Sequence, residues 1–242
     1  MKSILIKELN SFFSSPIAYL VIAVYLVING LFLWVFEGDY NILRNGFADL
    51  NSYFFLAPWI FIFLIPAITM RSFSDEINSG TIEILKTKPI SNWQVIMGKY
   101  IGGLVLVIFA ILPTLIYVYS VYQLGNPAGN IEFGTTFGSF IGLLFLASTY
   151  TAIGLFSSSL SKNQIVSFIV AVFISFFLFY GFDALASFNL LGDLDYTFQK
   201  IGMGEHYNSI SKGVVDTRDL IYFASLSAFF LILTNFRIQN EA

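Results

Sequence analysis

Residues 71–99 read RSFSDEINSGTIEILKTKPISNWQVIMGK and form a charged segment in an otherwise apolar sequence. The apolar runs on either side, residues 53–70 and 100–124, contain no Asp, Glu, Lys, Arg or His. Each run is long enough to cross a membrane, so we expect the charged segment to lie in water between two membrane spans. Its ionisable residues are Arg71, Asp75, Glu76, Glu83, Lys86, Lys88 and Lys99.

The first half of this segment has the pattern of a short amphipathic surface helix. Asp75 and Glu76 stand near its start, where the helix dipole favours negative charge, and Gly80 loosens it. Its apolar residues recur at helical spacing. They are Phe73, Ile77, Ile84 and Leu85.

The second half has the pattern of a break followed by a new helix. Pro89 cannot continue a helix, because it lacks a backbone N–H and its ring clashes with the preceding turn. Ser91 and Gln94 then form an S-x-x-Q capping box. We expect a helix to start there and to run into the next span.

Several residue types in this segment occur in a recognisable order. DE at 75–76, GTIEIL at 80–85, KPIS at 88–91 and GK at 98–99 resemble the segment before the third span of ABC-2 type permeases. In that family it is the coupling helix, which docks on a separate ATPase. The alternative is a solvated loop with one helical turn. The docking residues that the resemblance implies are Asp75, Glu76, Gly80, Thr81, Ile82, Glu83, Leu85 and Pro89.

The composition places the whole chain in the membrane. Of the 242 residues, 57% are hydrophobic and only 11% are charged. Soluble domains average about 25% charged residues, so a soluble core of this size would not hide so much apolar surface. The chain has no cysteine, which excludes disulfides and thiolate chemistry.

Long stretches without charged residues predict an all-α polytopic membrane protein that consists of one transmembrane domain, residues 1–242. Residues 1–15 are apolar at helical intervals and suit a helix lying in the membrane interface. Residues 71–99 are the expected cytoplasmic segment, and residues 183–219 the expected extracytoplasmic one. The six spans are expected at about 17–36, 53–70, 100–124, 134–160, 165–182 and 220–236.

Basic residues predict the orientation of the spans. The side with both termini, residues 71–99 and Lys162 carries eight Lys and Arg, and the other side carries four. Because cytoplasmic loops carry the excess of Lys and Arg, we expect both termini and the charged segment in the cytoplasm.

Catalytic signatures are weak in this chain. The only Gly-Lys pair, at 98–99, lacks the remainder of a phosphate-binding loop, so ATP hydrolysis is expected on a separate subunit. Two S-x-x-K matches, at 159–162 and 209–212, have no partner motifs. His206 is the only histidine, and a lone histidine implies no metal site. We expect no cofactor and no enzyme activity; an intramembrane enzyme is a remote alternative.

Small residues predict close helix packing. Gly134, Gly138 and Gly142 form a stripe, and Gly98 with Gly102 repeats the spacing. Such stripes let helix backbones approach in a membrane. Packing within one subunit and a dimer seam both remain open for the stripe. Asn29, the most polar side chain of the first span, is expected to serve packing through a hydrogen bond across helices.

Two further stretches resemble one branch of the ABC-2 permeases. Residues 7–19, KELNSFFSSPIAY, and residues 206–223, with GVVD at 213–216, are similar to the gliding-motility branch and its relative in copper-site maturation. Asp216, Arg218 and Asp219 are expected to form a polar cap near the outer interface.

The resemblance implies a permease subunit of an ATP-driven exporter of the type V kind, in the bacterial inner membrane. Its partners are a cytosolic ABC ATPase, a companion membrane subunit with a large extracytoplasmic domain or a second permease copy, and the lipid bilayer, without nucleic acid. The alternative in the same fold is a mechanotransmitter, which passes ATPase motion to an outer partner without moving a solute.

Overall fold

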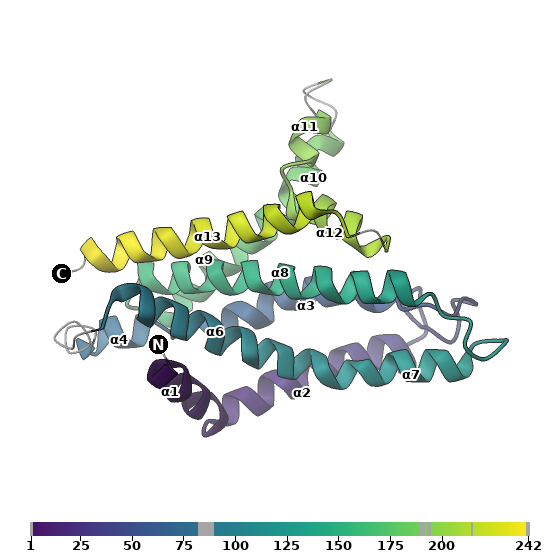
Figure 1. Ribbon diagram of the computed structural model, residues 1–242, viewed down its shortest axis with the longest axis horizontal. Coiled ribbons are helices and arrows are strands. Elements are labelled where there is room, and N and C mark those ends of the chain that lie inside the picture. Colours follow the sequence, from purple (N-terminus) through teal and green to yellow (C-terminus); the bar gives the residue numbers. More distant parts are fainter. Residues whose placement is uncertain (1, 82–89, 189–191, 193–194, 214, 241–242) are drawn as a thin grey trace.

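The computed structural model describes residues 2–81, 90–188, 192, 195–213 and 215–240. Within these residues every regular element is helical, and six helical stretches are long and apolar enough to cross a membrane (Figure 1). The predicted all-α, six-span fold is therefore confirmed. The six stretches are Pro16–Val35, Asn51–Asn78, Asn92–Leu124, Phe133–Leu160, Gln164–Ser187 and Thr217–Asn240.

The first span follows a separate N-terminal helix. The two are divided at Ser15, whose Oγ accepts a hydrogen bond from the Ile17 N–H at 3.3 Å. Pro16 occupies the first helical position, where its missing N–H costs nothing. The elements are α1 (Lys2–Phe13), α2 (Pro16–Gly30) and the π-helix η1 (Leu31–Val35).

The second and third spans both contain proline. α3 (Asn51–Thr69) continues through Pro58 and Pro66, whereas the third span tightens to a 3-10 turn at Pro113. Ser91 Oγ accepts from the Gln94 N–H at 3.3 Å and starts the third span, as the capping signal predicted. The remaining elements here are α4 (Ser74–Asn78), α6 (Asn92–Ile111), η2 (Leu112–Thr114) and α7 (Leu115–Leu124).

The fourth span is the centre of the bundle. α8 (Phe133–Leu160) packs against α3, α6, α9, α12 and α13. Its small residues make these close contacts possible: a Cβ placed on Gly154 would lie 1.9 Å from Thr69 Oγ1. α8 is thus the element that most of the other spans share. Its neighbours are α9 (Gln164–Phe176), the π-helix η3 (Phe177–Gly181) and α13 (Thr217–Asn240).

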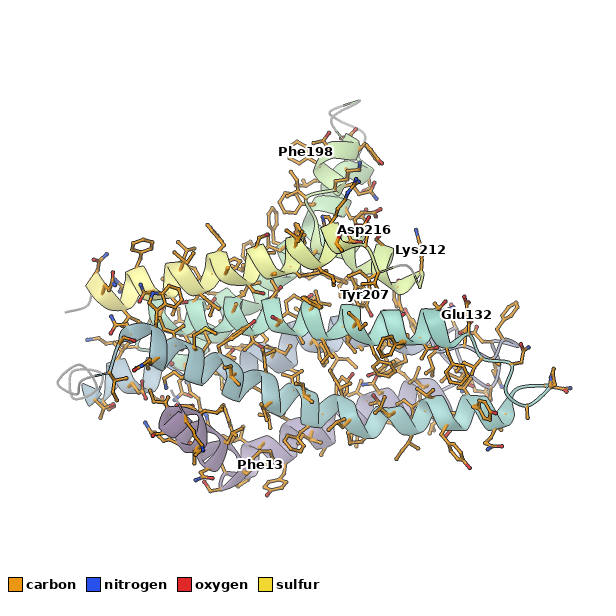
Figure 2. The ribbon with its side chains drawn as sticks, in the orientation of Figure 1. Phe13, Glu132, Phe198, Tyr207, Lys212 and Asp216 are labelled. Atoms are coloured by element: carbon orange, nitrogen blue, oxygen red, sulfur yellow. The ribbon has the colours of Figure 1, made fainter. Side chains whose placement is uncertain are left out.

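Between the fifth and sixth spans the chain forms three short helices. α10 and α11 project sideways from the bundle as an arm, in which Phe198 lies, while α12 lies near α8 at the base of the arm (Figures 1 and 2). These helices are α10 (Phe182–Ser187), α11 (Asp195–Gln199) and α12 (Met203–Ser211).

The two ends of the bundle differ in what they carry. α1, α4 and the C-terminal end of α13 lie at one end, and Glu132, at the start of α8, lies toward the other (Figures 1 and 2). Inside the bundle, Tyr53 Oη lies 2.9 Å from Tyr25 Oη and 2.8 Å from Thr114 Oγ1, joining the first three spans. Asn29 is buried, but its Nδ2 donates to the Tyr25 carbonyl of its own helix at 2.8 Å rather than across helices.

Candidate functional site

The predicted coupling segment begins with α4 at one end of the bundle. Of its predicted docking residues, the structure places Asp75 and Glu76 on α4 and Gly80 and Thr81 just after it. Ile82, Glu83, Leu85 and Pro89 lie outside the described residues.

α4 is shorter than the amphipathic pattern suggests. It ends at Asn78, and Gly80 follows with a φ of 68°, in the left-handed region that favours glycine. Gly80 thus ends this helix instead of loosening it. Asp75, Gly80 and Thr81 are exposed, so α4 and the residues after it present a polar surface at this end of the bundle.

The other side of α4 is attached to the bundle through Lys99. The Lys99 Nζ lies 3.0 Å from Glu8 Oε1, 3.0 Å from Glu76 Oε1 and 2.8 Å from the Ser72 carbonyl oxygen. An ammonium group has three N–H donors, and here each has its own acceptor. We call Lys99, Glu8, Glu76 and the Ser72 carbonyl the lysine node.

The lysine node is withdrawn from water. The Lys99 side chain is 3% exposed, and those of Glu8 and Glu76 are 12% and 13% exposed. The expectation that residues 71–99 lie in water is therefore wrong for Lys99. Burying an ammonium is favourable only when it is paired and hydrogen-bonded, and the two carboxylates and the carbonyl supply that pairing.

Two glycines allow the N-terminal helix to reach the node. A Cβ on Gly98 would lie 2.8 Å from Ile4 Cγ2, and one on Gly102 would lie 3.0 Å from Glu8 Cβ. Only a helix face without side chains at these two positions lets α1 lie against α6 so closely. The spacing of Gly98 and Gly102 thus serves packing within the chain and brings Glu8 to Lys99.

α4 also contacts the fourth and fifth spans. The Phe73 N–H donates to Ser158 Oγ of α8 at 2.7 Å, and Gln164 at the start of α9 donates to the Asp75 carboxylate. The segment is therefore joined to α1, α6 and α8 through its buried side and to α9 through the exposed Asp75 side chain. A displacement of α4 must move these elements or break these contacts.

Sequence reasoning found the segment but missed the node. Glu8 is separated from Lys99 by 91 positions, and no local pattern predicts such a pair. The available signals were a lysine at the start of an apolar run and a glutamate within an amphipathic helix.

A comparison with protein-family models shows the family of the chain. Residues 3–233 match the model described as ABC-2 family transporter protein. The chain belongs to the ABC-2 transporter family. ABC-2 permeases are transmembrane subunits that act with an ATPase partner, so the chain is a multi-pass membrane subunit of an ABC transporter. A comparison with curated proteins found no match to the chain.

The glycine stripe of this ABC-2 permease lies partly against its own short helix. A Cβ on Gly138 would be 3.1 Å from the Ile210 carbonyl oxygen of α12, and one on Gly142 would be 3.2 Å from Ile210 Cγ2. A Cβ on Gly134 would meet nothing within 4 Å. Gly138 and Gly142 therefore serve packing within the subunit, and Gly134 is the open end of the stripe.

Metal-ligand types are scattered over the permease. Within the described ranges, no group of three or more His, Cys, Asp or Glu side chains is arranged to hold a metal ion. Two of the polar clusters contain charged side chains in contact: the lysine node at the α4 end, and His206 with Asp219, whose Nδ1 and Oδ1 are 2.7 Å apart, toward the opposite end.

Proposed function

We propose that this ABC-2 permease docks a separate cytosolic ATPase through residues 71–99 and belongs to a transporter of the gliding-motility type. Residues 75, 80–83, 85 and 89 form the docking surface, and Glu76, which the sequence pattern also assigned to it, instead ties α4 to Lys99. The lysine node then transmits the movement of the ATPase to the spans.

The attachment of α4 is the observation that supports this proposal. A segment that transmits force needs a free surface for its partner and firm contacts behind it. The segment has both, because Gly80 and Thr81 after α4 are exposed while Glu76 and Ser72 are tied to the buried Lys99. A solvated loop with one helical turn has no need of a buried lysine bound to two carboxylates.

The gliding-motility branch rests on the resemblance of residues 7–19 and 206–223. It supports a companion membrane subunit with a large extracytoplasmic domain, or a second permease copy, as a partner. The excess of basic residues on the side of the termini supports a location in the bacterial inner membrane with both termini in the cytoplasm.

The experiment removes the side chain of Leu85, which we expect to be an anchor in a groove of the ATPase, and that of Glu83, which we expect to make a polar contact there. Leu85→Ala combined with Glu83→Ala leaves the described helices untouched. Truncation of a buried anchor typically costs about 2 kcal/mol or more, which is about thirtyfold in affinity. We expect the cognate ATPase to be lost on co-purification while the permease stays in the membrane.

A matched control removes the same two side-chain types from the opposite end of the bundle. Leu124 is 59% exposed at the end of α7, and Glu132 is exposed at the start of α8. Leu124→Ala with Glu132→Ala should leave the ATPase bound. Co-purification of the ATPase at the wild-type ratio with the Leu85 and Glu83 variant would contradict docking at this segment.

A further inference from the structure

The single histidine of the chain joins three elements at the end opposite α4. His206 lies on α12, and its Nδ1 is 2.7 Å from Asp219 Oδ1 of α13. Its Nε2 is 2.9 Å from the carbonyl oxygen of Lys200, which follows α11. The ring is stacked on Tyr222 with 3.8 Å between centroids. The side chains of His206 and Asp219 are 20% and 9% exposed, so the pair is largely shielded from water.

The two partners of the imidazole ring are both acceptors when Asp219 is ionised. A neutral imidazole has one N–H and makes only one of these two hydrogen bonds. Both contacts form together only when the pair holds one more proton than a neutral histidine and a carboxylate. Histidine ordinarily binds a proton more tightly than aspartate, so the proton belongs to the ring, which is then an imidazolium with two N–H donors.

The Lys200 contact holds the base of the arm formed by α10 and α11 (Figure 1). A second bond lies beside it, since Tyr222 Oη donates to the Ile201 carbonyl at 2.5 Å. Both bonds attach residues 200–201 to the ring stack of His206 and Tyr222. The arm thus depends on this stack for its position against α13.

α12 itself is held by other contacts. Tyr207, near the base of the arm (Figure 2), donates its hydroxyl to the Phe54 carbonyl of α3 at 2.8 Å. Burial raises the pKa of the Tyr207 phenol well above its usual value, so this hydroxyl keeps its proton when the medium becomes alkaline. The Ser139 hydroxyl of α8 also lies 3.2 Å from the Ser211 carbonyl. Loss of the histidine proton therefore frees the arm rather than α12.

The elements packed against α12 place several charged and polar side chains near the imidazole ring of His206. α13 presents Asp219 and Tyr222, with Asp216 and Arg218 at its start, where Asp216 Oδ1 accepts from the Arg218 N–H. The Lys200 ammonium lies over the Tyr196 ring at 4.3 Å, away from the imidazole contact made by its carbonyl. α8 presents Gly138, Ser139 and Gly142, and η3 presents Phe179.

On α12 itself, Glu205 is exposed. Asp219 is thus the charged group in contact with the ring.

We propose that His206 and Asp219 form a proton-dependent clasp that holds the base of the arm against the last span. The clasp is closed while the ring carries two protons. As the pH rises and the ring loses one of them, the Asp219 carboxylate keeps the remaining N–H in a charge-assisted bond, which is the stronger of the two. The bond to Lys200 is then lost, and the base of the arm is released except for the Tyr222 bond to Ile201. With the termini in the cytoplasm, the clasp responds to the pH outside the membrane.

Nitrogen-15 NMR of labelled histidine tests the proton count directly, because one histidine gives one pair of ring signals. The full chain is placed in lipid nanodiscs, purified without a histidine tag, and scanned from about pH 5 to about pH 10, which covers the values of most histidines in folded proteins. We expect both ring nitrogens to be protonated at the acidic end and one at the alkaline end. A ring that keeps the same number of protons over the whole scan would overturn the proposal.

Spin labels on Thr197→Cys and Ser225→Cys report the position of the arm. Both residues are exposed, and the natural chain has no cysteine. The distance distribution between the labels should shift and broaden over the same pH range in which the ring titrates. An unchanged distribution while the ring titrates would overturn the release of the arm.

Asp219→Asn is the variant that separates a clasp from a merely structural contact. An asparagine side chain donates its own N–H to Nδ1, so a neutral ring can make both contacts with the single N–H on Nε2. We expect the arm of this variant to stay in place at the alkaline end, where the wild-type arm is released. A variant whose arm follows pH as the wild type does would contradict the clasp. Wild-type NMR remains decisive if the variant does not fold.

Discussion

A largely buried side chain that can carry positive charge joins several elements at each end of the bundle, but the two side chains are of different kinds. At the α4 end, Lys99 has three acceptors, and its side chain is 3% exposed. At the opposite end, His206 has two acceptors, and its side chain is 20% exposed. Each cation joins three parts of the chain, so the same device is used twice.

The difference between the ends lies in the proton. Lysine ordinarily titrates about four pH units above histidine, so an ammonium keeps its charge where an imidazolium loses it. In the proposed mechanism, a lysine thus holds the segment that transmits force, and a histidine holds the arm. At the opposite end, the bond between His206 and the Lys200 carbonyl depends on the pH of the medium.

Removal of the Lys99 charge tests whether the lysine node holds the α4 end, and it has the largest expected effect. Lys99→Met keeps most of the side-chain length but leaves Glu8 and Glu76 side by side without the buried cation, and only the exposed Lys7, 3.5 Å from Glu76 Oε1, remains near them. Breaking a buried ion pair by removing one partner typically costs about 3–5 kcal/mol. We expect a large loss of resistance to thermal unfolding in nanodiscs, together with release of α1 from α6.

The matched control is Lys162→Met, which removes an exposed lysine from the turn between α8 and α9. Surface substitutions of this kind usually change the free energy of unfolding by about 0.5 kcal/mol or less. If the two variants melt at the same temperature, the lysine node does not hold the α4 end.

Composition and hydrophobic runs predicted the spans because their signal is local. About 20 apolar residues in succession have few alternatives to a membrane helix, and Ser91 predicted the start of α6 correctly. His206 carries no such local signal, and it lies on the short helix α12. Its partner Asp219 is 13 positions away on another helix, and helical periodicity does not predict such a pair.

The lysine node was hidden for a related reason. A charged side chain next to a span is normally expected to be exposed to water. In the sequence, Lys99 is one of several charged residues in the segment 71–99, and nothing sets it apart from the others. Its burial depends on Glu8, which reaches it only because Gly98 and Gly102 admit α1. Both glycines were noticed for their spacing, but the spacing does not name the helix that packs there.

A leucine in the glycine stripe tests whether α12, which carries His206, needs its close approach to α8. Gly138→Leu forces a side chain against the Ile210 carbonyl, 3.1 Å from the position of its Cβ, and pushes α12 away from α8. Overpacking of this kind typically costs about 1–3 kcal/mol. We expect reduced folded yield and a lower unfolding temperature, with the lysine node intact.

Gly134→Leu provides the contrast within the same stripe. A Cβ at this position meets nothing within 4 Å, so the subunit should fold with wild-type stability. If the open end of the stripe contacts a second copy, the variant should instead lower the dimer fraction by size-exclusion chromatography. Equal stability of Gly138→Leu and the wild type would show that α12 does not need the close approach.

Single cysteines between the spans have the smallest expected effect on folding and decide which compartment each end faces. The natural chain contains no cysteine, so Lys86→Cys, Glu132→Cys and Lys200→Cys each provide one thiol. In intact cells, a membrane-impermeant maleimide should label the second and third variants, and it should label Lys86→Cys only after the membrane is opened. Labelling of Lys86→Cys from outside would show that the orientation is the reverse of the one inferred from the basic residues. The lysine node would then face the outside, where no ATPase is available to it, and the histidine clasp would face the cytoplasm, where the pH varies little.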